Sequence, residues 1–306
     1  MKVDIVLISY NQEQYIAQAV ESILMQRVKD DVELRVIVAD DCSTDKTLEV
    51  IKDAERKQYE FISNAGLSEK QAVELRMVIP FVYLKADTNL GISKNYQRAF
   101  AACDSDYIAI LEGDDYWSSP YHLEQHVRFL DSHRECSMSM NTITYLKQGR
   151  SEFITPVWDY KDNVQYIDTQ TQIAKGNQLG NLSACVFRSL CIQALPQSLY
   201  EMLIADWMLG VMLSQKGLIA LFKESTSVYR MNENSQWASL TKNEQVKQMI
   251  MLAKQYDEYQ NGLYHDYWIL FENKLNSWSK TKKSDYLPPL IYKFLKAIYP
   301  PILKKK

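Results

Sequence analysis

No uninterrupted apolar stretch in the sequence reaches the roughly 20 residues that a helix needs to span a bilayer. No Cys-x-x-Cys pair occurs among the five cysteines, an odd number, which argues against a thiolate zinc site and for a reducing compartment. Glycine-rich phosphate loops of the Gly-x-Gly-x-x-Gly and Walker types are absent, which counts against dehydrogenases and P-loop kinases. The net charge of -3 lacks the basic excess typical of nucleic-acid binders, so we expect no nucleic-acid partner. The apolar run near the N-terminus is short and contains Asp4, so we expect no signal peptide and a cytoplasmic protein.

What is present is the composition of an ordinary globular enzyme. The chain has 306 residues, of which 46% are hydrophobic and 24% charged. Such a chain can bury a sizeable core without disulfides. Its length suits one large α/β domain, or one domain with a C-terminal extension.

Short apolar runs alternate with helical patterns along the first part of the chain. We predict strands at residues 3–8, 34–39, 80–85 and 107–111, and a helix after the first of them. This alternation is typical of βαβ units and a parallel sheet. We also predict an inserted helix at 68–78, a helix at 199–215, and a long helical region at 241–278 that breaks near Gly262.

Polar side chains gather just past the ends of these predicted strands. They are Asn11, Asp40, Asp41, Asn89, Asp114 and Asp115. In an open α/β sheet, ligands bind in the crevice outside the carboxyl ends of the strands. The pattern therefore predicts a site rich in carboxylates.

The acidic motif Glu112-Gly113-Asp114-Asp115 follows the apolar strand at 107–111. Adjacent carboxylates at a strand end repel each other unless a cation offsets them. Mg²⁺ or Mn²⁺ takes hard oxygen ligands at such a place and keeps positions open for substrate phosphates. A polar turn that caps the next helix is the alternative interpretation.

A second acidic turn, Asp40-Asp41-Cys42-Ser43-Thr44-Asp45, follows the strand at 34–39. A carboxylate here can accept hydrogen bonds from a nucleotide base or from ribose hydroxyls. Taken alone, the turn is better explained by simple capping of the following helix by Ser43, Thr44 or Asp45.

Together, the motifs resemble the family 2 glycosyltransferases of the GT-A fold, over about residues 1 to 235. The opening Val6-Leu7-Ile8-Ser9-Tyr10-Asn11 is similar to the family's first strand and donor-binding turn, and Ser22-Ile23-Leu24-Met25-Gln26 to its Ser-Ile-Leu-x-Gln helix. Asp40 to Asp45 resembles its Asp-Asp-x-Ser-x-Asp turn, and Asn89-Leu90-Gly91-Ile92-Ser93-Lys94-Asn95 its Asn-x-Gly-x-x-x-Asn element. Glu112 to Asp115 stands at its Asp-x-Asp position, and Asp206-Trp207 resembles its acidic catalytic motif.

The resemblance implies a GT-A fold: a mainly parallel sheet flanked by helices, here with a helical C-terminal extension. It implies a catalytic domain at 1–235 and an extension at 236–306. It also implies transfer of a sugar, with inversion, from a UDP-, GDP- or dTDP-sugar to an acceptor hydroxyl, with Mg²⁺ or Mn²⁺ as cofactor. By analogy, the acceptor is a glycan or lipid-linked glycan of bacterial surface polysaccharide or O-antigen.

Residue roles follow from the same resemblance. Asp206 is the implied catalytic base, and Asp114 and Asp115 are the implied metal ligands. The implied substrate-binding residues are Ser9, Tyr10, Asn11, Asp40, Asp41, Asn89, Lys94, Asp114, Trp207 and Arg230. Glu112 departs from the family, which usually has aspartate there.

Asp206 also suits a base on physical grounds. It lies in an apolar helical context, where desolvation raises the pKa of a carboxyl group and strengthens it as a base. A core aspartate bonded to a backbone N–H is the alternative. For Arg230, the alternative is a surface arginine at a strand end.

His122 and His126 stand four apart on a predicted helix, a spacing that can bind zinc. Because no third ligand is evident, we predict a solvated helix face.

The C-terminal tail, residues 280–306, carries eight lysines and one aspartate among aromatic and aliphatic residues. A basic amphipathic helix of this kind fits the surface of an anionic membrane, which would make the protein peripheral on the inner face of the cell membrane. A terminal helix packed on the domain fits the pattern equally well.

Two other functions compete with glycosyl transfer. A sugar nucleotidyltransferase also has an α/β sheet and a metal, but normally shows a glycine-rich loop near its N-terminus. A non-catalytic GT-A module that binds sugar nucleotides or acts as a scaffold is disfavoured because Asp114, Asp115 and Asp206 are all present.

Overall fold

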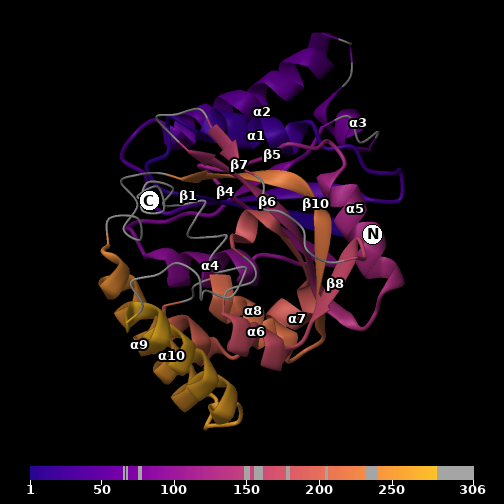
Figure 1. Cartoon of the computed structure of the whole chain (residues 1–306). Helices are drawn as coiled ribbons and strands as arrows, with labels where there is room; N and C mark the ends of the chain where they lie inside the picture. Colours follow the sequence, from indigo (N-terminus) through magenta and orange to yellow (C-terminus); the bar gives the residue numbers. More distant parts are fainter. Residues whose placement is uncertain are drawn as a thin grey trace.

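A single mixed β-sheet forms the centre of the protein, and helices cover both of its faces (Figure 1). The computed structural model describes residues 1–64, 66, 68–74, 78–147, 152–154, 161–176, 180–203, 206–231 and 240–280. The strands lie in the order β3-β2-β1-β4-β9-β6-β10-β5, with β7 beside β6 and β8 beside β10. Their bounds are β1 Lys2–Ser9, β2 Glu33–Asp40, β3 Phe81–Tyr83, β4 Tyr107–Glu112, β5 Tyr116–Trp117, β6 Cys136–Lys147, β7 Glu152–Ile154, β8 Val164–Ile167, β9 Cys185–Arg188 and β10 Leu218–Met231.

The N-terminal part of the sheet is parallel, as the sequence predicts. Strands β3, β2, β1 and β4 pair in parallel, and all of the predicted strands are present. The third is shorter than the predicted 80–85. The α/β fold with parallel strands flanked by helices is therefore confirmed.

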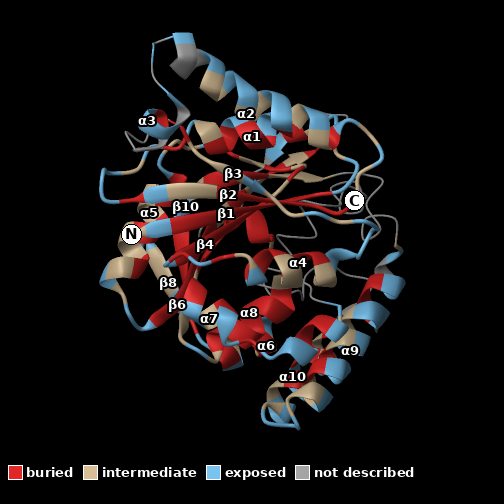
Figure 2. Ribbon diagram, turned by 180° about the vertical axis from the view of Figure 1, so that it is seen from behind, coloured by how far each residue is buried: buried red, intermediate tan, exposed pale blue. Residues whose placement is uncertain are grey.

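Residues of β1 alternate between two hydrophobic cores, because successive side chains of a strand point to opposite faces. Val3, Ile5 and Leu7 pack with helices α1 (Ile16–Leu24), α2 (Thr47–Asn64) and α5 (His122–Ser132). Val6 and Ile8 pack on the other face, with α4 (Ile92–Ala101) and α8 (Asp206–Ser214). Buried residues accordingly concentrate in the central strands (Figure 2).

The second half of the sheet is poorly signalled in the sequence. Strand β9 runs antiparallel to β4 and β6, whereas β10 runs parallel to β6. In β6, Ser137, Ser139 and Asn141 are buried. Polar residues inside a strand weaken the hydrophobic pattern, but here they find side-chain or backbone partners.

Two predicted helices differ from the structure. The inserted helix at 68–78 is present but short, α3 (Glu69–Glu74). The continuous helix predicted at 199–215 is wrong, because the 3-10 helix η2 (Gln197–Glu201) ends before Met202, whose backbone is extended. Helix α8 then starts at Asp206, where an acidic residue in the first turn suits the helix dipole. Short helices α6 (Thr169–Lys175) and α7 (Ser189–Gln193) complete this region.

The C-terminal region is helical and breaks near Gly262, as predicted, and its two helices pack together as a hairpin. Helices α9 (Lys242–Tyr259) and α10 (His265–Lys280) are joined by a turn in which Gly262 has a φ of 71°. Thr241 and Glu244 form a capping box at the start of α9. The predicted domain boundary at 235 and the tail from residue 281 onward lie outside the described residues. In the described part of the chain, no helix combines the length and apolar character needed to cross a bilayer.

Candidate active site

The carboxyl ends of β1, β2 and β4 meet at one edge of the sheet. Ser9 pairs with Asp40 at the end of the β1–β2 ladder, and Ile8 pairs with Glu112 on the β4 side. The structure therefore brings together the polar turns that the sequence places after these strands, as parallel pairing requires.

Asp40 is held inside its turn by hydrogen bonds from two serines. Ser9 Oγ donates to Asp40 Oδ2 at 2.9 Å. Ser43 donates through its backbone N–H to Oδ1 at 2.9 Å and through its hydroxyl to Oδ2 at 2.6 Å. The carboxylate thus links β1 to the turn after β2, and its predicted contact with the donor stays a prediction.

Asp41 joins this turn to the loop before α4. Its carboxylate accepts the backbone N–H groups of Leu90 at 2.8 Å and Gly91 at 2.9 Å. Asn89 Nδ2 donates to the Asp41 carbonyl at 3.2 Å. Gly91 has a φ of 77°, a conformation that glycine adopts readily.

Tyr10 and Asn11 form the rim beside these turns. The Tyr10 side chain is 47% exposed, which leaves an aromatic surface open to a ligand. Asn11 has a φ of 52° and accepts the Thr44 backbone N–H at 2.8 Å through Oδ1. Both remain predicted donor contacts.

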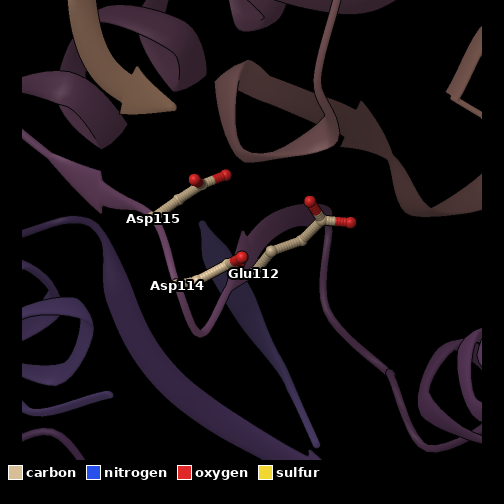
Figure 3. Close-up of side chains that lie close together, drawn as sticks. All are labelled: Glu112, Asp114 and Asp115. Carbon is tan, nitrogen blue, oxygen red and sulfur yellow. The ribbon is translucent and has the colours of Figure 1, made fainter. Parts of the chain in front are cut away.

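The acidic motif Glu112–Asp115 forms the centre of the site (Figure 3). Glu112, Asp114 and Asp115 each offer an oxygen, and these oxygens all lie within 4.8 Å of one another. Burial raises the pKa of all three carboxyl groups, and repulsion between neighbouring carboxylates raises those of Glu112 and Asp115 further. A cation would relieve this repulsion, so the donor set fits a divalent metal.

Three further residues, which no sequence motif indicated, hold this motif. Asn181 Nδ2 donates to Asp115 Oδ2 at 2.8 Å and to Glu112 Oε2 at 3.1 Å. Ser183 Oγ donates to Asp115 Oδ2 at 2.7 Å, and Tyr96 Oη donates to Glu112 Oε1 at 2.9 Å. Asn181 and Ser183 come from the segment before β9 and Tyr96 from α4, so only long-range folding brings them here.

Asp206 lies at the start of α8, on the side of the sheet where α4 packs. Burial raises the pKa of its carboxyl group to about 6. Its charge contributes to the raised pKa values of Glu112 and Tyr96, so the three groups are electrostatic neighbours. A carboxyl group with this pKa is poised to accept a proton near neutral pH.

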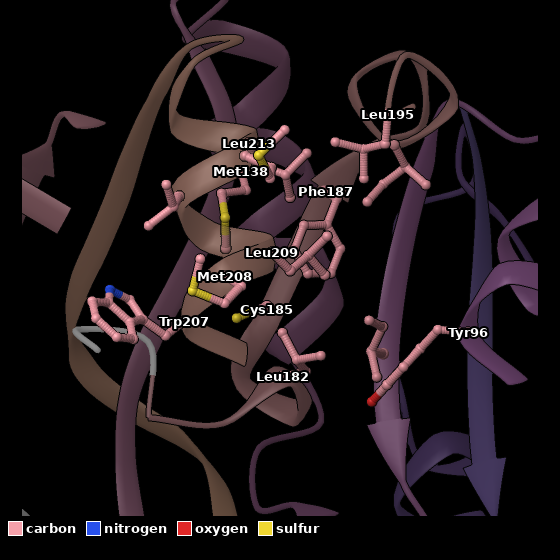
Figure 4. Close-up of a cluster of buried hydrophobic side chains, with 14 of the residues drawn as sticks. Tyr96, Met138, Leu182, Cys185, Phe187, Leu195, Trp207, Met208, Leu209 and Leu213 are labelled. Atoms are coloured by element: carbon pink, nitrogen blue, oxygen red, sulfur yellow. The ribbon is translucent and has the colours of Figure 1, made fainter. Parts of the chain in front are cut away.

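Trp207, next to Asp206, is part of the core. Its side chain is only 4% exposed, and its indole Nε1 donates to the Gln172 carbonyl at 2.9 Å. Figure 4 shows it at the start of α8, below Met208 and Leu209, which pack toward β9. Its predicted substrate contact stays a prediction, and the observed packing gives it a structural role.

Arg230 approaches the acidic motif from β10. Its backbone N–H donates to Asp115 Oδ1 at 3.0 Å. Its guanidinium lies over the rings of Tyr15 and Tyr116, 5.3 and 5.1 Å from their centroids. Burial raises the pKa of Asp114, and the positive charge of Arg230 offsets part of that rise. This positive charge at the motif is suited to an anionic ligand.

Lys94, by contrast, forms an ion pair with Glu201 across the gap between α4 and η2. The predicted contact of Lys94 with a diphosphate therefore stays a prediction.

The solvated face predicted for His122 and His126 is wrong. Both side chains are fully buried and lie side by side, with ring centroids 4.5 Å apart. His122 Nδ1 lies 2.8 Å from Thr226 Oγ1, and His126 Nδ1 lies 2.8 Å from Ser139 Oγ. Burial lowers both pKa values, that of His126 to about 3, so both rings are neutral. Polar residues on β6 and β10 make this burial possible.

Comparison with known proteins agrees with this geometry. Residues 4–155 match the family model described as Glycosyl transferase family 2. This stretch contains most of β1, all of β2 and β4, and the acidic motif. The chain belongs to glycosyltransferase family 2.

Relatives in this family come from several bacteria. The uncharacterized protein Rv1520 of Mycobacterium tuberculosis is 28% identical over 236 residues, which cover 77% of this chain and 60% of the relative. The putative teichuronic acid biosynthesis glycosyltransferase TuaG of Bacillus subtilis is 26% identical over 232 residues, or 76% of each chain. The putative glycosyltransferase EpsE of Bacillus subtilis is 35% identical over 133 residues, 44% of this chain and 40% of EpsE. The chain thus spans about 60% of the length of some relatives that it matches.

The fold has solved counterparts. Residues 1–349 of S. aureus TarS, in a complex with UDP-GlcNAc, superpose with a TM-score of 0.60 and 16% identity, covering 99% of this chain and 83% of that one. A complex of the same protein with UDP gives a TM-score of 0.52, with 97% and 88% coverage. The predicted GT-A fold with a helical C-terminal region is confirmed.

Proposed function

We propose that this protein is an inverting glycosyltransferase that moves a sugar from a nucleotide-diphosphate-sugar to an acceptor hydroxyl. The observation that carries the proposal is one carboxylate-rich edge of a parallel sheet. There the acidic motif has ligand oxygens within 4.8 Å of one another, and the charge of the Asp206 carboxyl group, whose pKa is about 6, acts on Glu112. Family membership supports the same chemistry.

Asp114 and Asp115 are the residues that would hold Mg²⁺ or Mn²⁺. Their oxygens are the hard ligands that these ions prefer, and no lysine or arginine among the described residues forms an ion pair with either carboxylate. A bound divalent ion supplies charge neutralisation to the diphosphate leaving group.

The donor nucleotide would lie along the rim formed by Ser9, Tyr10, Asn11 and the Asp40–Asp41 turn. The exposed Tyr10 ring offers a surface for stacking on the base. We propose UDP as the first nucleotide to test, with GDP and dTDP as alternatives, because the TarS structures contain UDP-GlcNAc and UDP. The Arg230 guanidinium offers positive charge to the diphosphate side.

Asp206 would accept the proton of the acceptor hydroxyl as that oxygen attacks the anomeric carbon. The bond from the anomeric carbon to the diphosphate breaks as the new glycosidic bond forms on the opposite face, which inverts the configuration. The pKa of about 6 keeps most of the carboxylate ionised at pH 7.

The acceptor we propose is a glycan or lipid-linked glycan of surface polysaccharide, built on the inner face of the cell membrane. The printed name of TuaG, a putative teichuronic acid biosynthesis glycosyltransferase, supports a polysaccharide product. The lysine-rich tail supports contact with anionic lipid. Deletion of residues 280–306 should move the protein from the membrane to the soluble fraction, and unchanged partitioning would refute that contact.

Isothermal titration calorimetry tests the donor site. UDP, GDP and dTDP are each titrated with and without Mn²⁺ into wild type, Asp115→Ala and a control, Asp53→Ala, whose carboxylate is exposed on α2. Metal-dependent binding of one nucleotide that is lost only in Asp115→Ala supports the proposal. Folded protein that binds none of the three would count against it.

Product analysis separates the proposed activity from its competitors. A glycosyltransferase releases a nucleoside diphosphate from the bound donor and forms a glycoside. A nucleotidyltransferase instead joins a sugar phosphate to a nucleoside triphosphate and releases pyrophosphate. A scaffold releases neither a nucleoside diphosphate nor pyrophosphate.

A further inference from the structure

The Asn181 amide has one possible orientation in this structure. Its Oδ1 accepts the backbone N–H of Ser183 at 2.5 Å, so the two hydrogens of its Nδ2 must face the other way. They are directed at Asp115 Oδ2 and Glu112 Oε2. One neutral amide therefore bridges two carboxylates that would otherwise repel each other.

The Ser183 hydroxyl is fixed equally well. It accepts the Glu112 backbone N–H at 3.1 Å and donates to Asp115 Oδ2 at 2.7 Å. The Ser183 carbonyl accepts the indole N–H of Trp117 at 2.8 Å, and that ring stacks on His122 with centroids 4.5 Å apart. The buried histidine pair thus supports the segment that contacts the acidic motif.

The hydrogen bonds of Asp115 are unevenly divided between its two oxygens. Among the described residues, Oδ2 accepts hydrogen bonds from Asn181 and Ser183, whereas Oδ1 accepts one from the Arg230 backbone N–H. Each carboxylate oxygen offers about two lone pairs, so Oδ2 is saturated and Oδ1 retains one. This leaves Oδ1 as the oxygen of Asp115 that can bind a cation.

All of these donors are uncharged. Among the described residues, the side chains that donate to Glu112 and Asp115 are an amide and two hydroxyls. A lysine or arginine at the same place would neutralise the carboxylates and compete with a metal ion. Neutral donors fix the direction of the carboxylate without bringing a positive charge of their own.

We propose that Asn181 and Ser183 are positioning residues that orient Asp115 so that its Oδ1 is presented to a divalent cation. The inference deepens the proposed function and rests on it. The segment before β9 would thus orient the cation site before the donor binds.

Ser105 provides a matched control at the other end of β4. Its hydroxyl accepts the Asp4 backbone N–H at 3.1 Å and donates to the Tyr107 carbonyl at 2.7 Å, and it is also buried. Like Ser183→Ala, Ser105→Ala therefore removes one accepted and one donated hydrogen bond of a buried hydroxyl, but its partners lie outside the acidic motif.

The test is a titration of Mn²⁺ alone, followed by the electron paramagnetic resonance signal of the free ion. Ser183→Ala and Asn181→Leu should each weaken Mn²⁺ binding about 10-fold, the scale typical of residues that orient metal ligands. Ser183→Thr, which keeps the hydroxyl, should bind like wild type, and Ser105→Ala should bind like wild type even if its melting temperature falls. Near-UV circular dichroism confirms that each variant is folded.

Equal Mn²⁺ affinities for Ser183→Ala, Asn181→Leu and Ser105→Ala would overturn the inference and leave the proposed function standing. Wild type that binds no Mn²⁺ would also overturn it, and the sugar-transfer assay would then decide separately whether the enzyme works without a metal.

Discussion

Trp207 and Trp268 meet edge to face, with ring centroids 5.4 Å apart, and this contact joins the helix of Asp206 to the last described helix of the chain. Phe271 packs on the same Trp207 ring at 4.5 Å. Tyr256, on α9, donates its hydroxyl to the Leu203 carbonyl at 2.7 Å. The C-terminal hairpin is therefore part of the core that supports α8.

Phe271→Ala should destabilise the protein by about 3–5 kcal/mol, because it leaves a cavity beside Trp207. The Phe271 side chain is fully buried, whereas Leu270, its neighbour on α10, is 46% exposed. Urea unfolding of Phe271→Ala, with Leu270→Ala as control, checks this expectation. Similar losses in the two variants would show that the hairpin contributes little to the core.

Asp206→Asn should reduce sugar transfer by about 10²–10⁴-fold, because an amide cannot take the proton of the acceptor hydroxyl. Nucleotide binding should be unchanged. Initial rates and calorimetry on the same preparation measure the two effects. The control is Asp266→Asn, which alters an exposed carboxylate in the first turn of α10. Full activity in Asp206→Asn would show that another group is the base.

The transfer rate should fall in acid with a midpoint at or below about pH 6. Asp206 has a pKa of about 6, and only its ionised form accepts a proton, so the rate should drop about tenfold per pH unit below the midpoint. A cation bound nearby favours the ionised form and would lower the midpoint. Rates at saturating substrate between pH 4 and 8 check the profile, and a midpoint above pH 7 would contradict it.

His126 should make folding stability depend on pH. Its pKa is about 3 in the folded protein and near 6.5 in the unfolded chain, so the unfolded state binds the extra proton as pH falls. Its contribution to the free energy of unfolding is fully present above pH 6.5 and is lost as pH falls toward 3. At pH 5 the loss amounts to about 2 kcal/mol.

His126→Gln removes this titration, so the stability difference between wild type and variant should shrink or reverse between pH 7.5 and 5. Taking the difference between the two proteins cancels the opposite contribution of the buried carboxyl groups, whose raised pKa values favour the folded state at lower pH. Urea unfolding at the two pH values gives the measurement. A difference that does not change with pH would mean that His126 is not buried in its neutral form.

The sequence by itself determined the parallel half of the fold and the place of the site. Residues 3–8, 34–39 and 107–111 are predominantly apolar runs followed by polar turns, and both features are local. Strands that pair in parallel bring their carboxyl ends to one edge, so Asp40, Asp41 and the acidic motif had to meet there. The break at Gly262 was equally local, because glycine tolerates its positive φ.

Only the tertiary structure decided which side chains hold those residues in place by hydrogen bonds. The partners of Asp115 come from positions 66 to 115 residues away in the chain, and no spacing pattern connects them. The prediction for the histidine pair was wrong for the same reason. Its helix face is covered by β6 and β10, whose Ser139 and Thr226 hydroxyls each form a hydrogen bond with the Nδ1 of one ring. Periodicity reports which face of an element is apolar, whereas hydrogen bonding across the core depends on contacts that form only when distant segments pack together.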